Sequence, residues 1–226
     1  MSDLVRSRLR DAVFGTQDAL ISTLGALTGI AEGTQDRGAV VIAGLVIIVV
    51  ESLSMAAGSY LSSKSQREYL ERLLREEEAA ITNDPEGERR EVWEMYRARG
   101  YADAEIAIVE RRLFSNKTLL LEDMAHKELG ICPQAMEDSV GNAVVMGAAY
   151  VLGGLMPVVP YLIWPMQPAM RVSIAGTLLA LFAFGGVKGR VVGQVWWRSG
   201  VEMLTVAGLA GLAGFVIGHV AGHIVR

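Results

Sequence analysis

The stretch Glu51–Glu68, ESLSMAAGSYLSSKSQRE, joins the end of a long apolar run to a segment dense in charge. Lys64–Ile81, which overlaps its end, contains no glycine or proline and is rich in strong helix formers. We therefore expect the helix of the apolar run to continue without a break into the charged segment. Such a helix is typical of a chain that leaves a membrane and enters water.

The whole chain has the composition of a membrane protein with one water-soluble insertion. Of its 226 residues 51% are hydrophobic, and the mean hydropathy is +0.33, whereas soluble domains seldom reach a positive value. More than a third of residues 64–138 are charged, and none of residues 139–161 is. The net charge of −4 argues against a nucleic-acid partner. The single cysteine, Cys132, can form no intrachain disulfide and is interpreted as incidental.

Five segments are candidates for membrane spans, which need about 20 apolar residues each. We expect an all-α membrane protein with five transmembrane helices and a helical domain inserted between the second and third spans. The first two helices occupy residues 1–63, the inserted domain 64–138 and the last three helices 139–226. The predicted spans are Val13–Ala31, Ala39–Leu61, Val140–Tyr161 (ending in Pro157 and Pro160), Met170–Val187 and Val201–His223.

Lysine and arginine set the orientation, because they concentrate in cytoplasmic loops. The asymmetry predicts a cytoplasmic N-terminus, an outer C-terminus and a cytoplasmic insertion. The cytoplasmic side receives Arg6, Arg8, Arg10, Lys64, Arg67, Lys188, Arg190 and Arg198, and the outer side receives Arg37, Arg171 and Arg226.

The insertion is predicted to be helical, with breaks where capping residues, proline and glycine occur. The expected helices are Lys64–Ile81, one from a cap at Asp84 with Pro85 in its first turn to about Gly100, one from a cap at Asp103 to Phe114, and one from a cap at Asn116 to Gly130.

Two carboxylates, Asp18 and Glu51, lie several residues inside predicted spans. A charge at the bilayer centre costs about 2.5–3.5 kcal/mol on insertion scales, so such groups usually face a cavity, a partner or a path. Each acid lies in a stripe of small residues that permits close helix packing; facing stripes would place both acids and the sulfur of Met55 in one polar seam. Alternatively, both acids are boundary residues, protonated or paired structurally. The stripes are Gly15, Asp18, Ser22, Gly25 and Gly29, and Glu51, Ser54, Met55 and Gly58.

The thioether of Met55 bears on which metal such a seam would select. Calcium and magnesium prefer sites made only of oxygen, whereas sulfur shifts the preference toward transition metals. The alternative is that Met55 only packs against its neighbours.

The insertion carries many glutamates on several helices. Glu88 and Glu91 share one helix face at spacing i,i+3, and Met124 and Glu128 share another at i,i+4. Carboxylates from several helices hold divalent metals in carboxylate-bridged bundles. The alternative is a set of solvated helix faces, with His126 as a surface residue.

Four motifs carry a resemblance to a known family: GTQDAL around Asp18, SMAAGSY at 54–60, LGGLMPVVPY at 152–161 and KELGI at 127–131. With these residues the chain resembles the vacuolar iron transporter family along almost its whole length. The resemblance implies a five-span homodimer with a translocation path between the subunits, lined by the first spans. It also implies transport of Fe²⁺, and in some members Mn²⁺, driven by proton antiport, with a cytoplasmic domain that gathers the metal.

The resemblance also assigns metal-binding residues. Asp18 matches the acid of the family's first span, and Met55 matches the methionine of its second. The matches in the cytoplasmic domain are Glu77, Glu88, Glu91, Met124 and Glu128.

The chain departs from the family pattern at three positions. Ile47 occupies the place of a second-span glutamate. Either Glu51, which is one turn closer to Met55, replaces that acid, or the proton step differs. Alanines occupy a glutamate and a methionine position of the cytoplasmic site. These alanines are Ala80 and Ala125, and the residues available to compensate are Glu76, Glu78 and His126.

We therefore predict a divalent metal/proton antiporter that exports Fe²⁺, with Mn²⁺ as second cargo and Zn²⁺ or Co²⁺ as further ligands. No catalytic residue or cofactor is expected; the partners are metal ions, protons, lipid and a second copy. Two alternatives stay open: a membrane-anchored ferroxidase, for which Asp123 and His126 form the single pair resembling a Glu-x-x-His motif, and a structural protein that docks a partner. The short tails favour a prokaryotic inner membrane, or the vacuolar membrane in a eukaryote.

Overall fold

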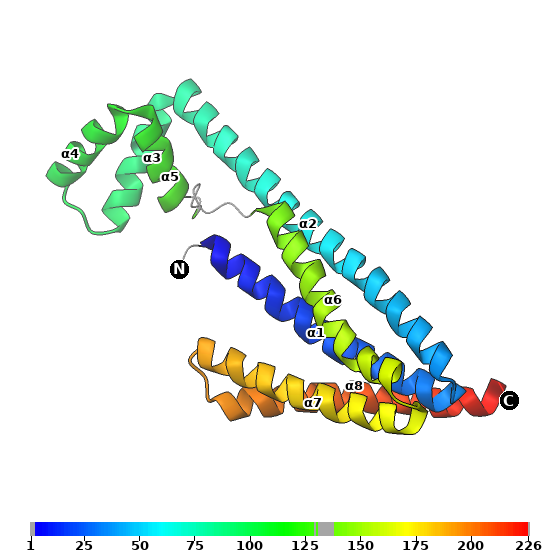
Figure 1. The fold of residues 1–226 in the computed structure, drawn as a ribbon. Helices are drawn as coiled ribbons and strands as arrows, with labels where there is room; N and C mark the ends of the chain where they lie inside the picture. The colour runs from blue at the N-terminus through cyan, green and yellow to red at the C-terminus, as the bar shows by residue number, and fades with distance from the viewer. Residues whose placement is uncertain (1–2, 129, 131–137, 226) are drawn as a thin grey trace. The chain divides into compact units, whose positions relative to one another are not determined.

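The computed structural model describes residues 3–128, 130 and 138–225, so Cys132 lies outside the described residues. Within these ranges the chain forms eight α-helices and no strand, which confirms the all-α class (Figure 1). The helices are α1 (Asp3–Thr34), α2 (Arg37–Asn83), α3 (Pro85–Ala98), α4 (Asp103–Phe114), α5 (Lys117–Lys127), α6 (Ser139–Ile163), α7 (Met166–Val191) and α8 (Trp196–Val225).

The long helix α2 passes through Glu51–Glu68 without interruption, as its sequence predicts. It contains 47 residues. At 1.5 Å per residue its length is about 70 Å, more than twice the ~30 Å thickness of a hydrocarbon core. Only its apolar first half therefore suits the interior of a membrane.

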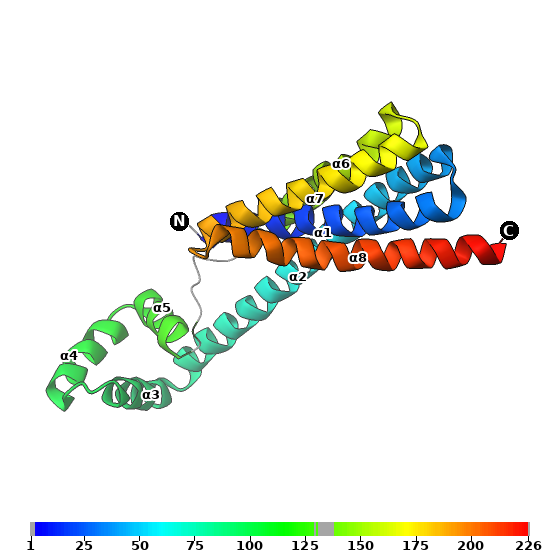
Figure 2. The same ribbon diagram turned by 90° about the horizontal axis from the view of Figure 1, so that it is seen from below.

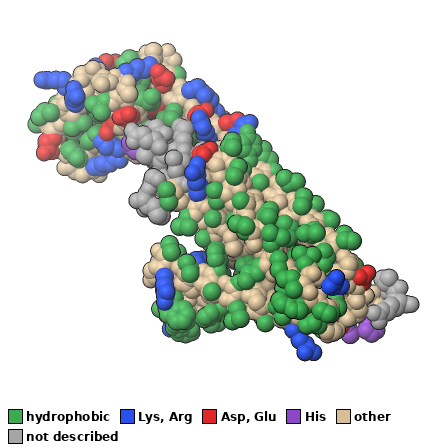
Figure 3. Space-filling model, in the orientation of Figure 1, with side chains coloured by type: hydrophobic (Ala, Val, Ile, Leu, Met, Phe, Trp, Pro, Cys, Tyr) green, Lys and Arg blue, Asp and Glu red, His purple; other side chains and the backbone are tan. Residues whose placement is uncertain are grey.

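The chain divides into two compact units. Val5–Leu61 with Ser139–Arg226 form one, called here the apolar unit, and Met1–Leu4 with Ser62–Asp138 form the other, called the charged unit. Hydrophobic side chains cover much of the visible face of the apolar unit, and charged side chains gather on the charged unit (Figure 3).

Among the described residues, four helices are long and apolar enough to cross a membrane: α2, α6, α7 and α8. The helix α1 is not among them, because Gln17, Asp18 and several hydroxyl side chains interrupt its apolar residues. It nevertheless packs within the apolar unit, where Leu20, Leu24 and Leu27 are buried. A fifth span at α1 stays a prediction.

The core of the apolar unit joins its helices around α1. Side chains of α1, α2, α6 and α7 pack together there, and α8 runs alongside α1 (Figure 2). The fully or almost fully buried members are Leu27, Ala31, Val40, Ile48, Val158, Tyr161 and Ala169.

The helix α6 continues through both prolines to Ile163, two residues beyond the end of the predicted span at Tyr161. Pro157 and Pro160 lie inside it. The carbonyl oxygen of Pro157 accepts a hydrogen bond of 2.7 Å from the Ser173 hydroxyl of α7. Neighbouring helices and hydroxyl side chains commonly satisfy backbone groups at prolines in apolar helices.

The helices of the charged unit begin close to the predicted caps. The Asp84 carboxylate accepts from the Gly87 amide at 2.9 Å, and Asn116 caps α5 as expected. At α4 the prediction is wrong by one residue: Ala102 is the N-cap, and the Glu105 carboxylate accepts from its amide at 2.8 Å. Asp103 is thus the first residue of the helix, where its negative charge interacts favourably with the helix dipole. The helix α5 ends at Lys127 rather than near Gly130.

Candidate functional site

The two carboxylates of the apolar helices come together. Asp18 on α1 and Glu51 on α2 lie near enough for their charges to repel each other. Asp18 is half-buried, whereas Glu51 is exposed in the single chain. Met55 is half-buried one turn after Glu51 on α2. Two acids that repel each other at one place favour a site that binds a cation or a proton.

A third polar group at this place was not singled out from the sequence. Tyr150 on α6 is completely buried, and its hydroxyl lies 2.8 Å from the hydroxyl of Ser22 on α1. The charges of Asp18 and Glu51 both act on it. A signal was available, since a tyrosine in an uncharged span needs a partner for its hydroxyl.

A buried acid at the start of α1 was also missed. Asp11 is 3% exposed, and its carboxylate accepts a hydrogen bond of 2.9 Å from the Ser59 hydroxyl of α2. Arg10 lies 3.4 Å from its other oxygen. Asp11 precedes Asp18 by seven residues, or about two helical turns, so both acids lie on one side of α1. That spacing was the signal in the sequence.

The small-residue stripes of α1 and α2 do not pack face to face. A Cβ atom on Gly15 would come within 2.8 Å of the Met146 carbonyl oxygen of α6, and one on Gly29 within 2.5 Å of the Gly214 carbonyl oxygen of α8. A Cβ on Gly58 of α2 would meet nothing within 4 Å. The helix α1 therefore uses its glycines against α6 and α8, because α8 has small residues of its own there.

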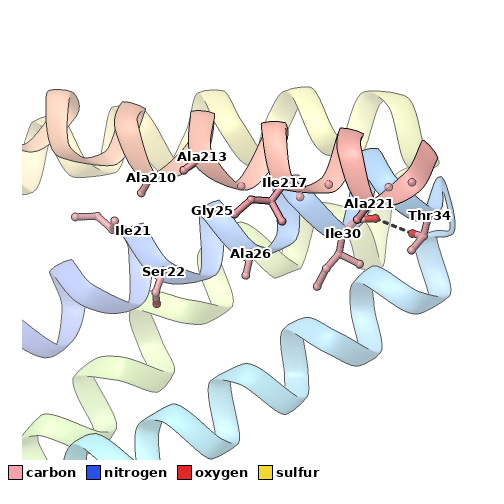
Figure 4. A pocket seen from close by; sticks show the side chains of 15 residues that line it. Ile21, Ser22, Gly25, Ala26, Ile30, Thr34, Ala210, Ala213, Ile217 and Ala221 are labelled. Carbon is pink, nitrogen blue, oxygen red and sulfur yellow. Dashed lines mark hydrogen bonds between the residues drawn. The ribbon is translucent and has the colours of Figure 1, made fainter. Parts of the chain in front are cut away.

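An apolar hollow of about 620 Å³ runs along α1 and α8 (Figure 4). Glycine and alanine form much of its wall. Ser22, whose hydroxyl is hydrogen-bonded to that of Tyr150, is also among its lining residues. Ser22 lies one turn after Asp18 on α1. The hollow thus borders α1, the helix that carries Asp11 and Asp18.

In the charged unit, four predicted ligands converge from three segments. Glu77 of α2 and Glu88 of α3 are buried, with 7% and 4% of their surface exposed. Glu91 and Glu128 are exposed, and their charges act on both buried acids. One oxygen of Glu77 and one of Glu88 are buried without a hydrogen-bond partner among the described groups. Buried, unsatisfied carboxylate oxygens call for a bound ion or water.

This convergence raises the pKa values of three of the four acids. Burial, followed by the charges of Glu128, Glu88 and Glu91, raises the pKa of Glu77 to about 7. Burial and the neighbouring charges also raise the pKa values of Glu88 and Glu128. A divalent cation would reverse these effects by supplying the missing positive charge.

Met124 lies in a different environment from the four acids. Its side chain is completely buried in the hydrophobic core with Val92, Tyr96 and Ile106. Packing in this core explains the burial of Met124 without a metal. Its role as a metal ligand stays a prediction. Across the described residues, no three histidine, cysteine, aspartate or glutamate side chains are placed to form a ready-made metal site.

The residues considered as substitutes have other surroundings. Glu78 forms an ion pair of 3.0 Å with Lys117, and Glu76 forms one of 3.5 Å with Arg72. His126 is exposed.

The acid of the possible ferroxidase pair is also engaged structurally. The Asp123 carboxylate accepts from the Tyr96 hydroxyl at 2.9 Å and pairs with Lys127. These contacts give Asp123 a structural role, so nothing here favours the ferroxidase alternative.

Comparison with known proteins bears out the resemblance. The family model described as the VIT family matches residues 9–219. The chain is 31% identical to "Vacuolar iron transporter 1" of Arabidopsis thaliana over 216 residues, which cover 95% of this chain and 86% of that protein. It is 32% identical to "Vacuolar iron transporter 2" of Oryza sativa subsp. japonica over 208 residues, covering 92% and 85%.

A more distant relative is covered to a similar extent. The chain is 25% identical to "Vacuolar iron transporter" of Plasmodium falciparum over 229 residues, covering 96% of this chain and 84% of that protein. All three relatives are named as transporters, which supports the prediction that the chain is not an enzyme. Their names place them in the vacuole, so they give no support to a prokaryotic inner membrane.

Proposed function

The chain belongs to the VIT family, and on that premise we propose that it transports Fe²⁺ out of the cytoplasm in exchange for protons. Mn²⁺ is the second cargo. The observation that carries the proposal is the proximity of Asp18 and Glu51 to each other and to the buried hydroxyl of Tyr150, within the apolar unit. Such a group of acids is costly in a membrane unless it binds an ion or a proton.

The charged unit collects the metal in this proposal. Glu77, Glu88, Glu91 and Glu128 supply the oxygens, and Met124 adds its sulfur when the metal is bound. The two buried oxygens without partners support this assignment. Oxygen ligands with a single sulfur suit Fe²⁺ or Mn²⁺ better than a metal that prefers thiolates.

Competition between metal and protons drives release. A carboxylate binds a metal ion only in its deprotonated form. Protons that enter from the outer side neutralise Asp18 or Glu51, and the affinity for the metal held there and by Met55 falls. The ion then leaves outward, and loss of the protons to the cytoplasm restores the site.

A second copy of the chain completes the site in the membrane. Glu51 is exposed on an apolar helix in the single chain, where it would meet lipid. A homodimer that places the first spans of both copies around one path would shield Glu51 and give the ion a polar surface. Five spans, with α1 as the first, and a cytoplasmic charged unit complete the proposed topology in a vacuolar-type membrane.

Flux measurements in proteoliposomes with an imposed pH gradient test this function. Asp18→Ala and Met55→Ala are expected to reduce proton-coupled Fe²⁺ uptake strongly. Glu202→Gln, an exposed acid on α8, and Met156→Ala, an exposed methionine on α6, are the matched controls. Full flux in both test variants would show that the proposed path is wrong. Oxygen consumption on addition of Fe²⁺, measured in the same samples, would instead identify a ferroxidase.

A further inference from the structure

Two of the three histidines of the chain lie together at the end of α8. His219 and His223 are one helical turn apart, and their ring centroids are 4.5 Å from each other. Glu32, near the end of α1, contacts His219, so α1 and α8 meet at this place. A hollow of about 360 Å³ lies over the group, lined also by Gln35. Asp18, Glu51 and the charged unit do not contribute to its lining.

The hydrogen bonds select one tautomer of each ring. Nδ1 of His223 lies 2.8 Å from the carbonyl oxygen of His219, and a carbonyl oxygen can only accept. Nδ1 of His219 lies 3.1 Å from a carboxylate oxygen of Glu32, which also accepts. Both Nδ1 atoms therefore carry the proton in the neutral rings, and both Nε2 atoms keep a lone pair for a metal.

The spacing suits two ligands of one ion. Histidines at i and i+4 on one helix face are a common metal-binding pair. With metal–nitrogen bonds of about 2.0–2.1 Å, two neighbouring imidazoles on one ion have centroids roughly 5 Å apart. A carboxylate that holds the Nδ1 proton of a ligating histidine is the usual outer partner in such sites.

We propose that His219 and His223 bind one transition-metal ion through their Nε2 atoms, with Glu32 as the residue that positions the ring of His219. Imidazole selects ions such as Fe²⁺, Co²⁺, Ni²⁺, Cu²⁺ and Zn²⁺ over Mg²⁺ and Ca²⁺. Two protein ligands leave the other positions to water, and the exposed rings open onto the hollow. The site differs in chemistry and place from the sites of the proposed transport path, and its binding can be measured without transport.

Cu²⁺ serves as the probe, because it binds nitrogen ligands most tightly among these ions and is paramagnetic. One equivalent is added to the full-length protein in detergent, and pulsed electron paramagnetic resonance detects the remote Nδ1 atoms of bound imidazoles. The expected spectrum shows two imidazoles. His219→Ala and His223→Ala are each expected to lower that number, whereas His126→Ala, which removes the remaining histidine, leaves the spectrum unchanged. A spectrum without imidazole, or one that both alanine variants leave intact, overturns the proposal.

Variants of Glu32 test its positioning role. Glu32→Ala is expected to weaken Cu²⁺ binding, followed through the imidazole signal, by about tenfold or more, as for other outer partners of metal-bound histidine. Glu32→Gln keeps an oxygen that accepts from Nδ1 and is expected to retain most of the affinity. Equal affinity of the wild type and Glu32→Ala would remove Glu32 from the site.

Discussion

The side chains of Glu77 on α2 and Glu88 on α3 are both buried, and they lie close enough for the charge of Glu88 to act on Glu77. Two neighbouring carboxyl groups resist being ionised together, because their charges repel each other. Burial, followed by the neighbouring negative charges, raises the pKa of Glu77 to about 7. A divalent cation bound beside Glu77 would oppose this rise, because it favours the ionised carboxylate.

This pair predicts how the stability of the metal-free protein depends on pH. Folded Glu77 releases its proton near pH 7, and in the unfolded chain it does so near its ordinary value of 4.5. Between these values the folded state binds more protons, so the free energy of unfolding falls as the pH rises and levels off above the folded pKa. The melting temperature of the full-length protein in EDTA is expected to decrease from about pH 5 to about pH 8.

Glu77→Gln, which cannot titrate, should flatten this dependence. The exposed Glu122 provides the matched control, and Glu122→Gln should keep the slope of the wild type. An unchanged slope in Glu77→Gln would show that the proton is held elsewhere.

Metal binding at the same acids predicts a gain in stability. At pH 7.5 and about 100 times its dissociation constant, Mn²⁺ should stabilise the protein by about 2.7 kcal/mol, and EDTA should reverse the effect. Glu88→Gln removes a buried ligand charge and should abolish most of this gain, which thermal unfolding and the spectrum of free Mn²⁺ both report. Stabilisation of the variant equal to that of the wild type contradicts the assignment.

The hydroxyl of Tyr150 is predicted to support transport. Tyr150→Phe keeps the buried ring but removes the 2.8 Å contact with Ser22 and a polar neighbour of Asp18 and Glu51. A lost hydrogen bond of about 0.5–1.5 kcal/mol corresponds to roughly a 2- to 12-fold lower Fe²⁺ flux in proteoliposomes. Tyr161→Phe, on the same helix about three turns away, is the control and should have a smaller effect. Equal flux in both variants and the wild type would leave Tyr150 with a packing role alone.

Close packing of α1 against α8 predicts sensitivity to a single methyl group. A Cβ on Gly29 would come within 2.5 Å of the Gly214 carbonyl oxygen, and backbone cannot move aside as a flexible side chain can. Gly29→Ala is therefore expected to destabilise the protein by about 1–3 kcal/mol. At Gly208 of α8 a Cβ meets nothing within 4 Å, so Gly208→Ala is the matched control. Unfolding in mixed detergent measures both, and equal stability of the two variants would contradict the close approach.

The limits of prediction from sequence follow from the range of each interaction. The caps at Asp84 and Asn116 depend on atoms within three residues, and both were predicted correctly. The hydrogen bond from the Ser173 hydroxyl of α7 to the Pro157 carbonyl of α6 joins two separate helices, and no local pattern predicts it. Similarly, the spacing that puts Asp11 and Asp18 on one side of α1 is visible in the sequence, but the hydrogen bond that the Ser59 hydroxyl of α2 donates to Asp11 is not.

By itself, the sequence determined the all-α class, the unbroken helix through Glu51–Glu68 and the family, because hydropathy, helix formers and local motifs act over short distances along the chain. Only the tertiary structure decided that Glu77 and Glu88 are buried close together, that Tyr150 lies near Asp18 and Glu51, and that the glycines of α1 pack against α6 and α8. Each of these depends on the direction in which side chains of separate helices meet, and that direction arises from packing the whole unit rather than from any one segment.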